Sequence, residues 1–279
     1  GLDGADHGDV RERFDRGELP VLRALAEGGG FGLLRSTLPP ASCPAWPTMT
    51  TGMNPGDLGV FDLTMPDGYG KRIVTERDVP APRLWDYVGA GGARSVIFNV
   101  PVTFPPRPIQ GVLVSGFLSP PDVPFSEPRE VGEELERELG YRPGHEHSRR
   151  AQVAAVRRAA EAFLHVLRGQ RWEVAMLVIS PTDWAQHHYW ANTAHRRRIF
   201  AAADEAIGRI VQQAGAGNVA VISDHGFTGA KRILNVNRLL HRLGFLAYGE
   251  GRSQRAYAPN VELVESRRRG PIGRLLGKL

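Results

Sequence analysis

Cysteine is almost absent from this chain, because Cys43 is the single thiol among 279 residues. One cysteine excludes an intramolecular disulfide and makes the cytoplasm the expected compartment. Long apolar runs are also missing, and no stretch approaches the roughly 20 residues that a membrane-spanning helix needs. With 42% apolar and 23% charged residues, the composition is typical of a soluble globular protein, in one large domain or two small ones.

Lysine is scarce too, so the net charge of +5 comes mostly from arginine. A basic balance indicates contact with nucleic acid or an anionic membrane, or else basic residues spread over solvated faces. Aromatic residues do not alternate with the basic ones as a surface for single strands requires. We favour the solvated faces and expect no nucleic-acid partner.

The two ends of the chain carry further signals. It begins without Met, directly before Asp3, and it ends in a basic segment, residues 252–279, that contains Arg267–Arg269. We therefore expect a fragment cut at both ends, and a lost signal peptide is compatible with that start. The basic segment suits a helix lying on a membrane, but Gly270 and Pro271 weaken it, so membrane contact is the less favoured hypothesis.

Short apolar, β-branched runs alternate with longer patterns of helical period, which indicates an α/β fold with a mostly parallel sheet covered on both faces. The proline-rich residues 101–128 are interpreted as a long excursion over the carboxyl edge of that sheet, within one domain that spans residues 1–279. The expected strands are Phe31–Ser36, Ser95–Asn99, Val112–Ser115, Val174–Ser180 and Val219–Ser223. The expected helices are Val10–Glu27, Arg83–Val88, Glu130–Glu138, His147–Arg168 and Ala194–Gln213.

Acidic residues follow the expected strands at the points where these end. Asp183 and Asp224 each come after an apolar run, and Asp3 stands where a preceding strand would have ended. Ligands of open α/β sheets bind outside the carboxyl ends of the strands. Three carboxylates gathered at one edge repel one another unless cations lie between them, so this pattern predicts a metal site.

Histidines accompany two of these carboxylates. Asp183 and His187 are four residues apart, so on a helical turn they face the same way, although a merely polar helix face explains the pair as well. Asp224 and His225 are adjacent at a strand-to-turn junction, where Gly226 gives the backbone freedom to turn. A simple Asx turn is the alternative there.

A third cluster is the proline-rich stretch around Ser42, which precedes a helix expected from about Pro47. A hydroxyl near the amino end of a helix lies where free amides and the helix dipole favour phosphate. A serine in that place is, by itself, more often only a helix cap. Its weight comes from its occurrence together with the other two clusters.

Taken in order, these motifs resemble the type I phosphodiesterase/nucleotide pyrophosphatase family, a branch of the alkaline phosphatase superfamily. The resemblance rests on Gly-Leu-Asp3-Gly, Ser42-Cys-Pro-Ala-Trp with Thr-Thr-Gly52, Asp183-x-x-x-His187 and Ser-Asp224-His225-Gly. It implies an alkaline-phosphatase-like three-layer sandwich, with a mostly parallel central sheet flanked by helices. It also implies a hydrolase of phosphate esters that acts on a small-molecule substrate.

The resemblance assigns a role to each matched residue. Ser42 corresponds to the nucleophile, which would attack phosphorus in line and form a covalent phosphoserine. Two divalent metals are implied, most often zinc, with manganese as the alternative. The implied metal ligands are Asp3, Ser42, Asp224 and His225 for one ion, and Asp183 and His187 for the other.

The chain departs from the family pattern in places. A third histidine ligand for the Asp183/His187 metal is expected well downstream and is not found, since His241 is interpreted as a surface residue. Ala45 stands where many nucleotide pyrophosphatases have a phosphate-binding Asn, which puts nucleotide specificity in doubt. Cys43 does not fit the sulfatase motif and is interpreted as a buried neighbour. The alternative function is therefore an inactive or incomplete fragment of this fold that lacks a metal ligand.

Overall fold

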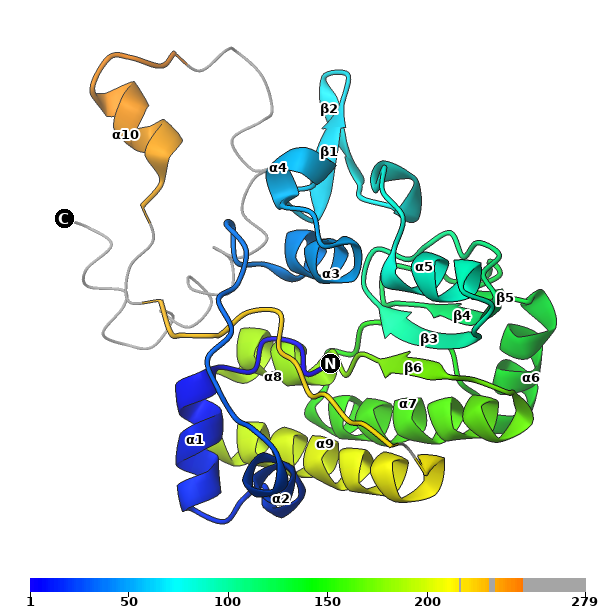
Figure 1. The fold of residues 1–279 in the computed structure, drawn as a ribbon. Coiled ribbons are helices and arrows are strands. Elements are labelled where there is room, and N and C mark those ends of the chain that lie inside the picture. The colour runs from blue at the N-terminus through cyan, green and yellow to red at the C-terminus, as the bar shows by residue number, and fades with distance from the viewer. Residues whose placement is uncertain (216, 231–233, 248–279) are drawn as a thin grey trace. The chain divides into compact units, whose positions relative to one another are not determined.

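The computed structural model describes residues 1–215, 217–230 and 234–247. Its centre is a mixed sheet in the order β5-β4-β3-β6 (Figure 1). Strand β3 (Ser95–Val100) pairs in parallel with both β4 (Gly111–Ser115) and β6 (Val174–Leu177), and β5 (Ser126–Glu127) joins the edge antiparallel to β4. The predicted α/β class and mostly parallel sheet are confirmed.

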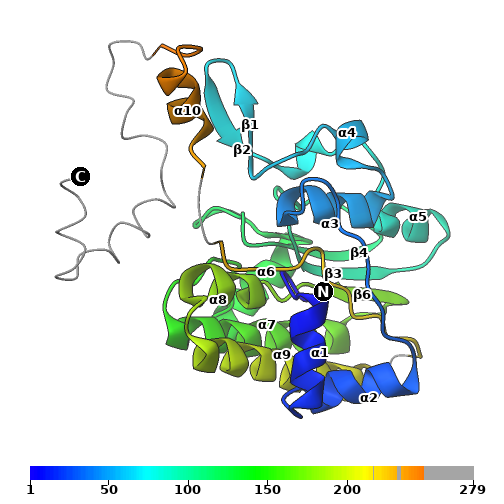
Figure 2. The same ribbon diagram turned by 90° about the vertical axis from the view of Figure 1, so that its left-hand side faces the viewer.

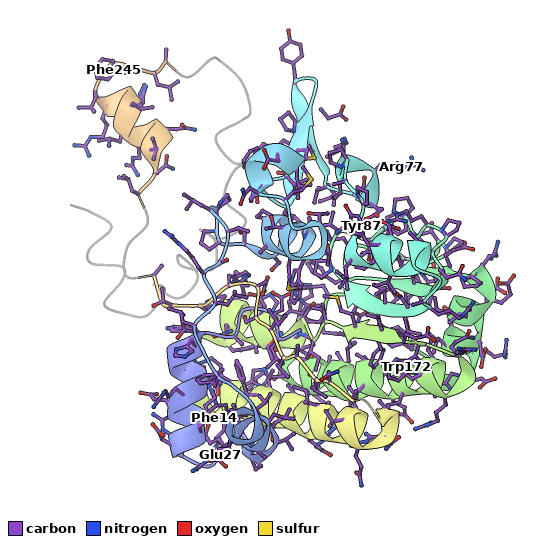
Figure 3. The ribbon with its side chains drawn as sticks, viewed as in Figure 1. Phe14, Glu27, Arg77, Tyr87, Trp172 and Phe245 are labelled. Carbon is purple, nitrogen blue, oxygen red and sulfur yellow. The ribbon has the colours of Figure 1, made fainter. Side chains whose placement is uncertain are left out.

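Helices cover both faces of this sheet and make three layers (Figures 1 and 2). Along β3, Val96 and Phe98 pack on the core shared with α6 (Arg129–Leu139), α7 (Arg149–Gly169) and α9 (Thr193–Ala214). Ile97 points the other way, to a core formed with Trp46 of α3 (Ser42–Thr51) and Trp85 of α5 (Leu84–Ala90). This alternation of side chains along a strand is what a sheet buried on both faces requires. Tyr87 of α5, labelled in Figure 3, is exposed.

The long helix predicted over Val10–Glu27 is two helices, α1 (His7–Asp15) and α2 (Pro20–Gly28). The Asp6 side chain caps α1. Gly17, at a φ of +67°, turns the chain, and Pro20 begins α2 with the φ that a first helical residue adopts. The other predicted helices are confirmed within one or two residues as α5, α6, α7 and α9.

Two predicted strands, Phe31–Ser36 and Val219–Ser223, are wrong. Both segments are extended, but a strand needs a backbone partner and neither has a ladder among the described residues. Leu33 and Leu34 are largely exposed. A cavity of about 530 Å³ lies between β6 and residues 218–222. Near one end of this segment, the N–H of Leu2 donates a backbone hydrogen bond to Ile222 O.

The segment between α3 and α5 holds structure that periodicity did not predict. It contains the short helix α4 (Pro55–Leu58), the hairpin of β1 (Thr64–Asp67) and β2 (Gly70–Ile73), and a 3₁₀ turn at Glu76–Asp78. The hairpin is tied down by Arg72, whose guanidinium donates to both carboxylate oxygens of Asp78. The proline-rich residues 101–128 include β4 and β5, so part of that segment belongs to the sheet.

A buried ionic cluster anchors the 3₁₀ turn to α5. The Arg83 side chain is fully buried and pairs with Glu76, and it also donates to Thr50 Oγ1 at 2.9 Å. Arg107 Nε donates to the same Glu76 carboxylate at 2.8 Å. Burial lowers the pKa of Arg83, and the charge of Glu76 opposes that shift.

We expect Glu76→Gln to reduce the free energy of unfolding by about 3 kcal/mol, because it leaves the Arg83 charge buried without a counter-charge. Denaturant unfolding followed by circular dichroism measures the change. The control is Glu27→Gln, which breaks an exposed ion pair with Arg23 and should leave the free energy of unfolding close to that of the native chain. Equal effects of the two substitutions would contradict the role assigned to the cluster.

Residues 1–229 form one compact unit, and residues 230–279 form another. In the second unit, the described residues include α10 (Val236–Arg242) and exposed His241, which agrees with its interpretation as a surface residue. The basic segment 252–279 lies outside the described residues. Every helix in the described residues is too short or too polar to span a bilayer. The single domain over 1–279 stays a prediction.

Candidate active site

Three of the predicted ligands meet beside the end of β6. Leu2 forms a parallel bridge with Ile179, and its N–H donates to Ile222 O at 2.9 Å, so the backbone here lies between two neighbouring segments. This places Asp3 beside Asp224 and His225, and the ligand atoms of these three residues lie within 4.8 Å of one another. Asp3 and Asp224 are almost wholly buried.

Ser42 lies against this group. Its Oγ donates to Asp3 Oδ1 at 3.0 Å and lies 3.1 Å from His225 Nε2. Helix α3 begins at Ser42 itself and not near Pro47 as predicted. Its cap, Ala41, offers no side-chain bond, and the N–H groups of Ser42 and Cys43 have no acceptor among the described residues. The start of α3 therefore presents a hydroxyl and free amides at one place.

The proton on His225 can be assigned from its partner. Nδ1 lies 2.8 Å from Gly226 O, and a carbonyl oxygen only accepts, so Nδ1 carries the proton of the neutral ring. The lone pair of Nε2 then faces Asp224 Oδ2 at 3.3 Å and Asp3 Oδ1 at 3.7 Å. In this tautomer, an ion shared by Nε2 and the two carboxylates would remove the repulsion between their lone pairs.

Two buried carboxylate oxygens strengthen this argument. Asp224 Oδ1 accepts from Gly4 N at 3.1 Å, but Asp224 Oδ2 and Asp183 Oδ1 accept no hydrogen bond. Buried acceptors without a donor are costly and rare in folded proteins. Burial, and then the charges of Asp224 and Asp183, raise the pKa of Asp3 well above its usual range. The carboxylate and imidazole donors fit a divalent cation.

The second predicted pair lies on α8 (Pro181–Tyr189), which confirms that Asp183 and His187 share a helix. His187 Nε2 lies 3.4 Å from Asp183 Oδ2, and the His187 side chain is 61% exposed. Burial, and then the charge of Asp224, raise the pKa of Asp183, while the nearby histidines oppose that shift. Among the described residues, no group of three close ligands includes Asp183 or His187, so the pair lacks a third partner there.

Gly4 is a site residue that the sequence reasoning missed. At a φ of +66°, it lies so close to α8 that a Cβ would stand 2.9 Å from Asp183 Oδ1. Its carbonyl accepts from Gln186 Nε2 at 2.7 Å, and Thr182 Oγ1 donates to Asp3 O at 2.7 Å. Side chains of α8 therefore hold the backbone that carries Asp3. The sequence contained a sign of this close approach, because a glycine directly follows Asp3 in the Leu-Asp-Gly motif.

We expect Gly4→Ala to lower kcat/KM for a phosphate ester by at least about tenfold, because the added methyl displaces Asp183, and to cost about 1–2 kcal/mol of stability. Gly17→Ala is the matched control. Its φ of +67° imposes the same backbone strain, but nothing lies within 4 Å of the new methyl. Activity assays and thermal unfolding of both variants separate the two effects, and equal losses of activity would refute the contact with Asp183.

Position 226 needs a glycine for a different reason from the predicted one. Its φ is not positive, so a left-handed turn does not require glycine there. A Cβ would instead stand 2.6 Å from Asp6 Oδ2, so glycine allows a close approach of two segments.

Cys43 is buried as expected, and burial, and then the charges of Asp3 and Asp62, raise the pKa of its thiol to about 12. It stays a neutral thiol at physiological pH.

Comparison with known proteins bears on this arrangement. Over residues 1–278 the chain matches the family described as Type I phosphodiesterase / nucleotide pyrophosphatase. It belongs to that family. None of the curated proteins matches this member of the type I phosphodiesterase family. The predicted resemblance is therefore confirmed.

Solved structures share the fold of this type I phosphodiesterase family member. Phosphonoacetate hydrolase from Sinorhizobium meliloti 1021 matches in its complex with phosphonoacetate (TM-score 0.67, 18% identity) and in its complex with phosphonoformate (TM-score 0.64, 16% identity). Each match covers 88% of this chain and 60% of the hydrolase chain, so the chain spans about three fifths of the length of these neighbours. The chain therefore shares the fold of this hydrolase, and the predicted three-layer α/β architecture is confirmed.

Proposed function

We propose that this chain carries the catalytic core of a metal-dependent hydrolase of phosphate esters, with Ser42 as the nucleophile. The observation that carries the proposal is the position of the Ser42 hydroxyl, within hydrogen-bond distance of both Asp3 and His225 and beside buried carboxylate oxygens that have no donor. Membership of the family supports the same reaction class.

Each residue has a role in this proposal. Asp3, Asp224 and His225 would hold one divalent cation against Ser42 Oγ, and Asp183 and His187 would contribute to a second. Bound cations of this kind lower the pKa of a hydroxyl and neutralise phosphate oxygens. Zinc is the favoured ion, because imidazole and carboxylate donors suit it, and manganese is the alternative.

The chain's own groups would orient the substrate. The free amides at the start of α3 and its helix dipole would bind a non-bridging phosphate oxygen and bring phosphorus to Ser42 Oγ. Oγ would then form the bond to phosphorus as the alcohol of the ester leaves. Water would release the phosphoryl group from Ser42 in a second step, as phosphate from a monoester or as a phosphomonoester from a diester. The proposed substrate class is a small-molecule phosphate ester.

An inactive or incomplete core is the second candidate. The observation in its favour is that Asp183 and His187 have no third ligand among the described residues. In that case the chain would retain the fold and one cation half-site but would not complete the reaction.

The test is hydrolysis of bis-p-nitrophenyl phosphate and p-nitrophenyl phosphate by this chain, loaded with zinc or manganese. Release of nitrophenol that a chelator abolishes would support the hydrolase. Cation binding that Asp224→Asn weakens, without release of nitrophenol, would favour the incomplete core. If the metal-loaded chain cleaved neither ester, the hydrolase proposal would fail.

A further inference from the structure

A second cluster of potential ligands lies outside the group around Ser42. His145 and His147 precede α7, and His188 lies in the last turn of α8. Each histidine offers one ring nitrogen, and these three nitrogens lie within 4.8 Å of one another. The cluster contains no carboxylate, so it differs in chemistry from the Asp3, Asp224 and His225 group.

Packing holds these rings in place. The His145 ring lies against Trp184, at 4.6 Å between ring centroids, and is 5.2 Å from the His188 ring. The His147 ring lies 4.7 Å from His145 and 5.1 Å from His188. Ligands that are already ordered lose less conformational entropy when they bind an ion.

Gln152 of α7 contacts one of the three rings, that of His188. It is fully buried, and its Nε2 lies 3.1 Å from His188 Nδ1, which leaves Nε2 as the ligand atom of that ring. Ligation at Nε2 requires the ring proton on Nδ1, so the amide of Gln152 must turn to accept it through Oε1. This turn costs the bond from Gln152 Nε2 to Glu146 O at 2.9 Å. It also replaces the contact of Gln152 Oε1 with His195 Nε2 at 2.8 Å, so the His195 ring must then accept from the amide at Nε2.

Protonation of the His145 ring is disfavoured. Burial, and then the neighbouring imidazoles, lower the pKa of His145 to about 4. A neutral imidazole keeps a lone pair that is free to bind a metal. A set of three imidazoles binds zinc, nickel and copper ions in preference to magnesium and calcium.

We propose that His145, His147 and His188 bind a divalent transition metal at a site separate from the one around Ser42. This ion would tie the segment ahead of α7 to α8, the helix that carries Asp183 and His187. The site does not depend on the proposed hydrolase activity, since none of its ligands is assigned to that reaction.

The test measures Ni²⁺ bound per chain by equilibrium dialysis in the native chain and in three variants. In His147→Ala one class of Ni²⁺ sites should weaken by at least about tenfold, whereas His225→Ala should keep that class. The matched control is His7→Ala, which removes a histidine that stacks on Phe31 and lies outside every group of three close ligands among the described residues, so it should leave Ni²⁺ binding as in the native chain. Native-like Ni²⁺ binding by His147→Ala, or loss of all Ni²⁺ in His225→Ala, would overturn the proposal.

Location is tested independently by oxidation with Cu²⁺ and ascorbate, followed by mass spectrometry of the peptides. Oxidation should concentrate on His145, His147 and His188, and excess Zn²⁺ should protect them. Oxidation confined to His225, or to His165, would count against the site. His147 is exposed, so its alanine variant should unfold like the native chain without metal. If it does not, His188→Gln replaces it in the dialysis experiment.

Discussion

Ser42→Ala is expected to lower kcat/KM for a phosphate ester by about 10⁴-fold or more, because it removes the oxygen that would bond to phosphorus. A loss of this size corresponds to about 5.5 kcal/mol of transition-state stabilisation. Steady-state assays with bis-p-nitrophenyl phosphate measure the loss. With p-nitrophenyl phosphate as the substrate, mass spectrometry of an acid-quenched reaction should find phosphate on the Ser42 peptide of the native chain.

Two controls separate chemistry from folding in this experiment. Ser42→Thr keeps the hydroxyl and should retain activity within about tenfold. Thr51→Ala removes another hydroxyl of α3, one that donates to Pro47 O at 2.8 Å, and should leave activity near the native value. A Ser42→Ala variant that kept more than a tenth of the native kcat/KM would exclude Ser42 as the nucleophile.

Chelation of divalent cations should lower activity by about 10³-fold or more and the melting temperature by roughly 5–10 °C. The reason is that Asp3, Asp224 and Asp183 then face one another without a counter-charge, and that a ligand bound only to the native state stabilises it. Metal analysis before and after chelation, with calorimetry of both samples, measures the effect. Unchanged activity in protein shown to be free of metal would refute the metal requirement.

The Asp224→Asn variant sharpens this prediction. Asparagine keeps the shape but removes the charge, so cation binding beside Ser42 should weaken and chelation should barely shift the melting temperature. The same substitution relieves repulsion with Asp3, so the metal-free variant should be at least as stable as the metal-free native chain. The control is Glu27→Gln, an exposed change on α2 that should respond to chelation as the native chain does.

The candidate site was predictable from sequence to the extent that it follows from parallel strands. Asp183 lies in the first turn of α8, shortly after β6, and Asp224 follows an extended segment. The rule that ligands bind outside the carboxyl ends of strands gathers both with Asp3. The approach of Ser42 to Asp3 was implied only by the family resemblance, since 39 residues separate them. The start of α3 was predicted five residues late because its prolines were interpreted as stiffening the approach, whereas Pro44 is tolerated in a first helical turn.

The two failed strands show the limit of periodicity. Val219–Ser223 has the composition of a buried strand, but a strand also needs a neighbour to bond, and local composition carries no information about that neighbour. The three-histidine cluster could not be predicted for a similar reason. His145 and His188 come from different elements, and nothing in the spacing between them indicates a contact.

Helix α8 is a structural element shared by both candidate cation sites. It carries Asp183 and His187 on the side of Asp3 and presents His188 to the three-histidine cluster. If an ion at one site shifts or stiffens this helix, the two binding equilibria become thermodynamically linked. The linkage is reciprocal. The factor by which an ion at the three-histidine cluster changes the cation affinity of the Asp183 half-site must equal the factor by which a cation at the half-site changes the affinity of the three-histidine cluster.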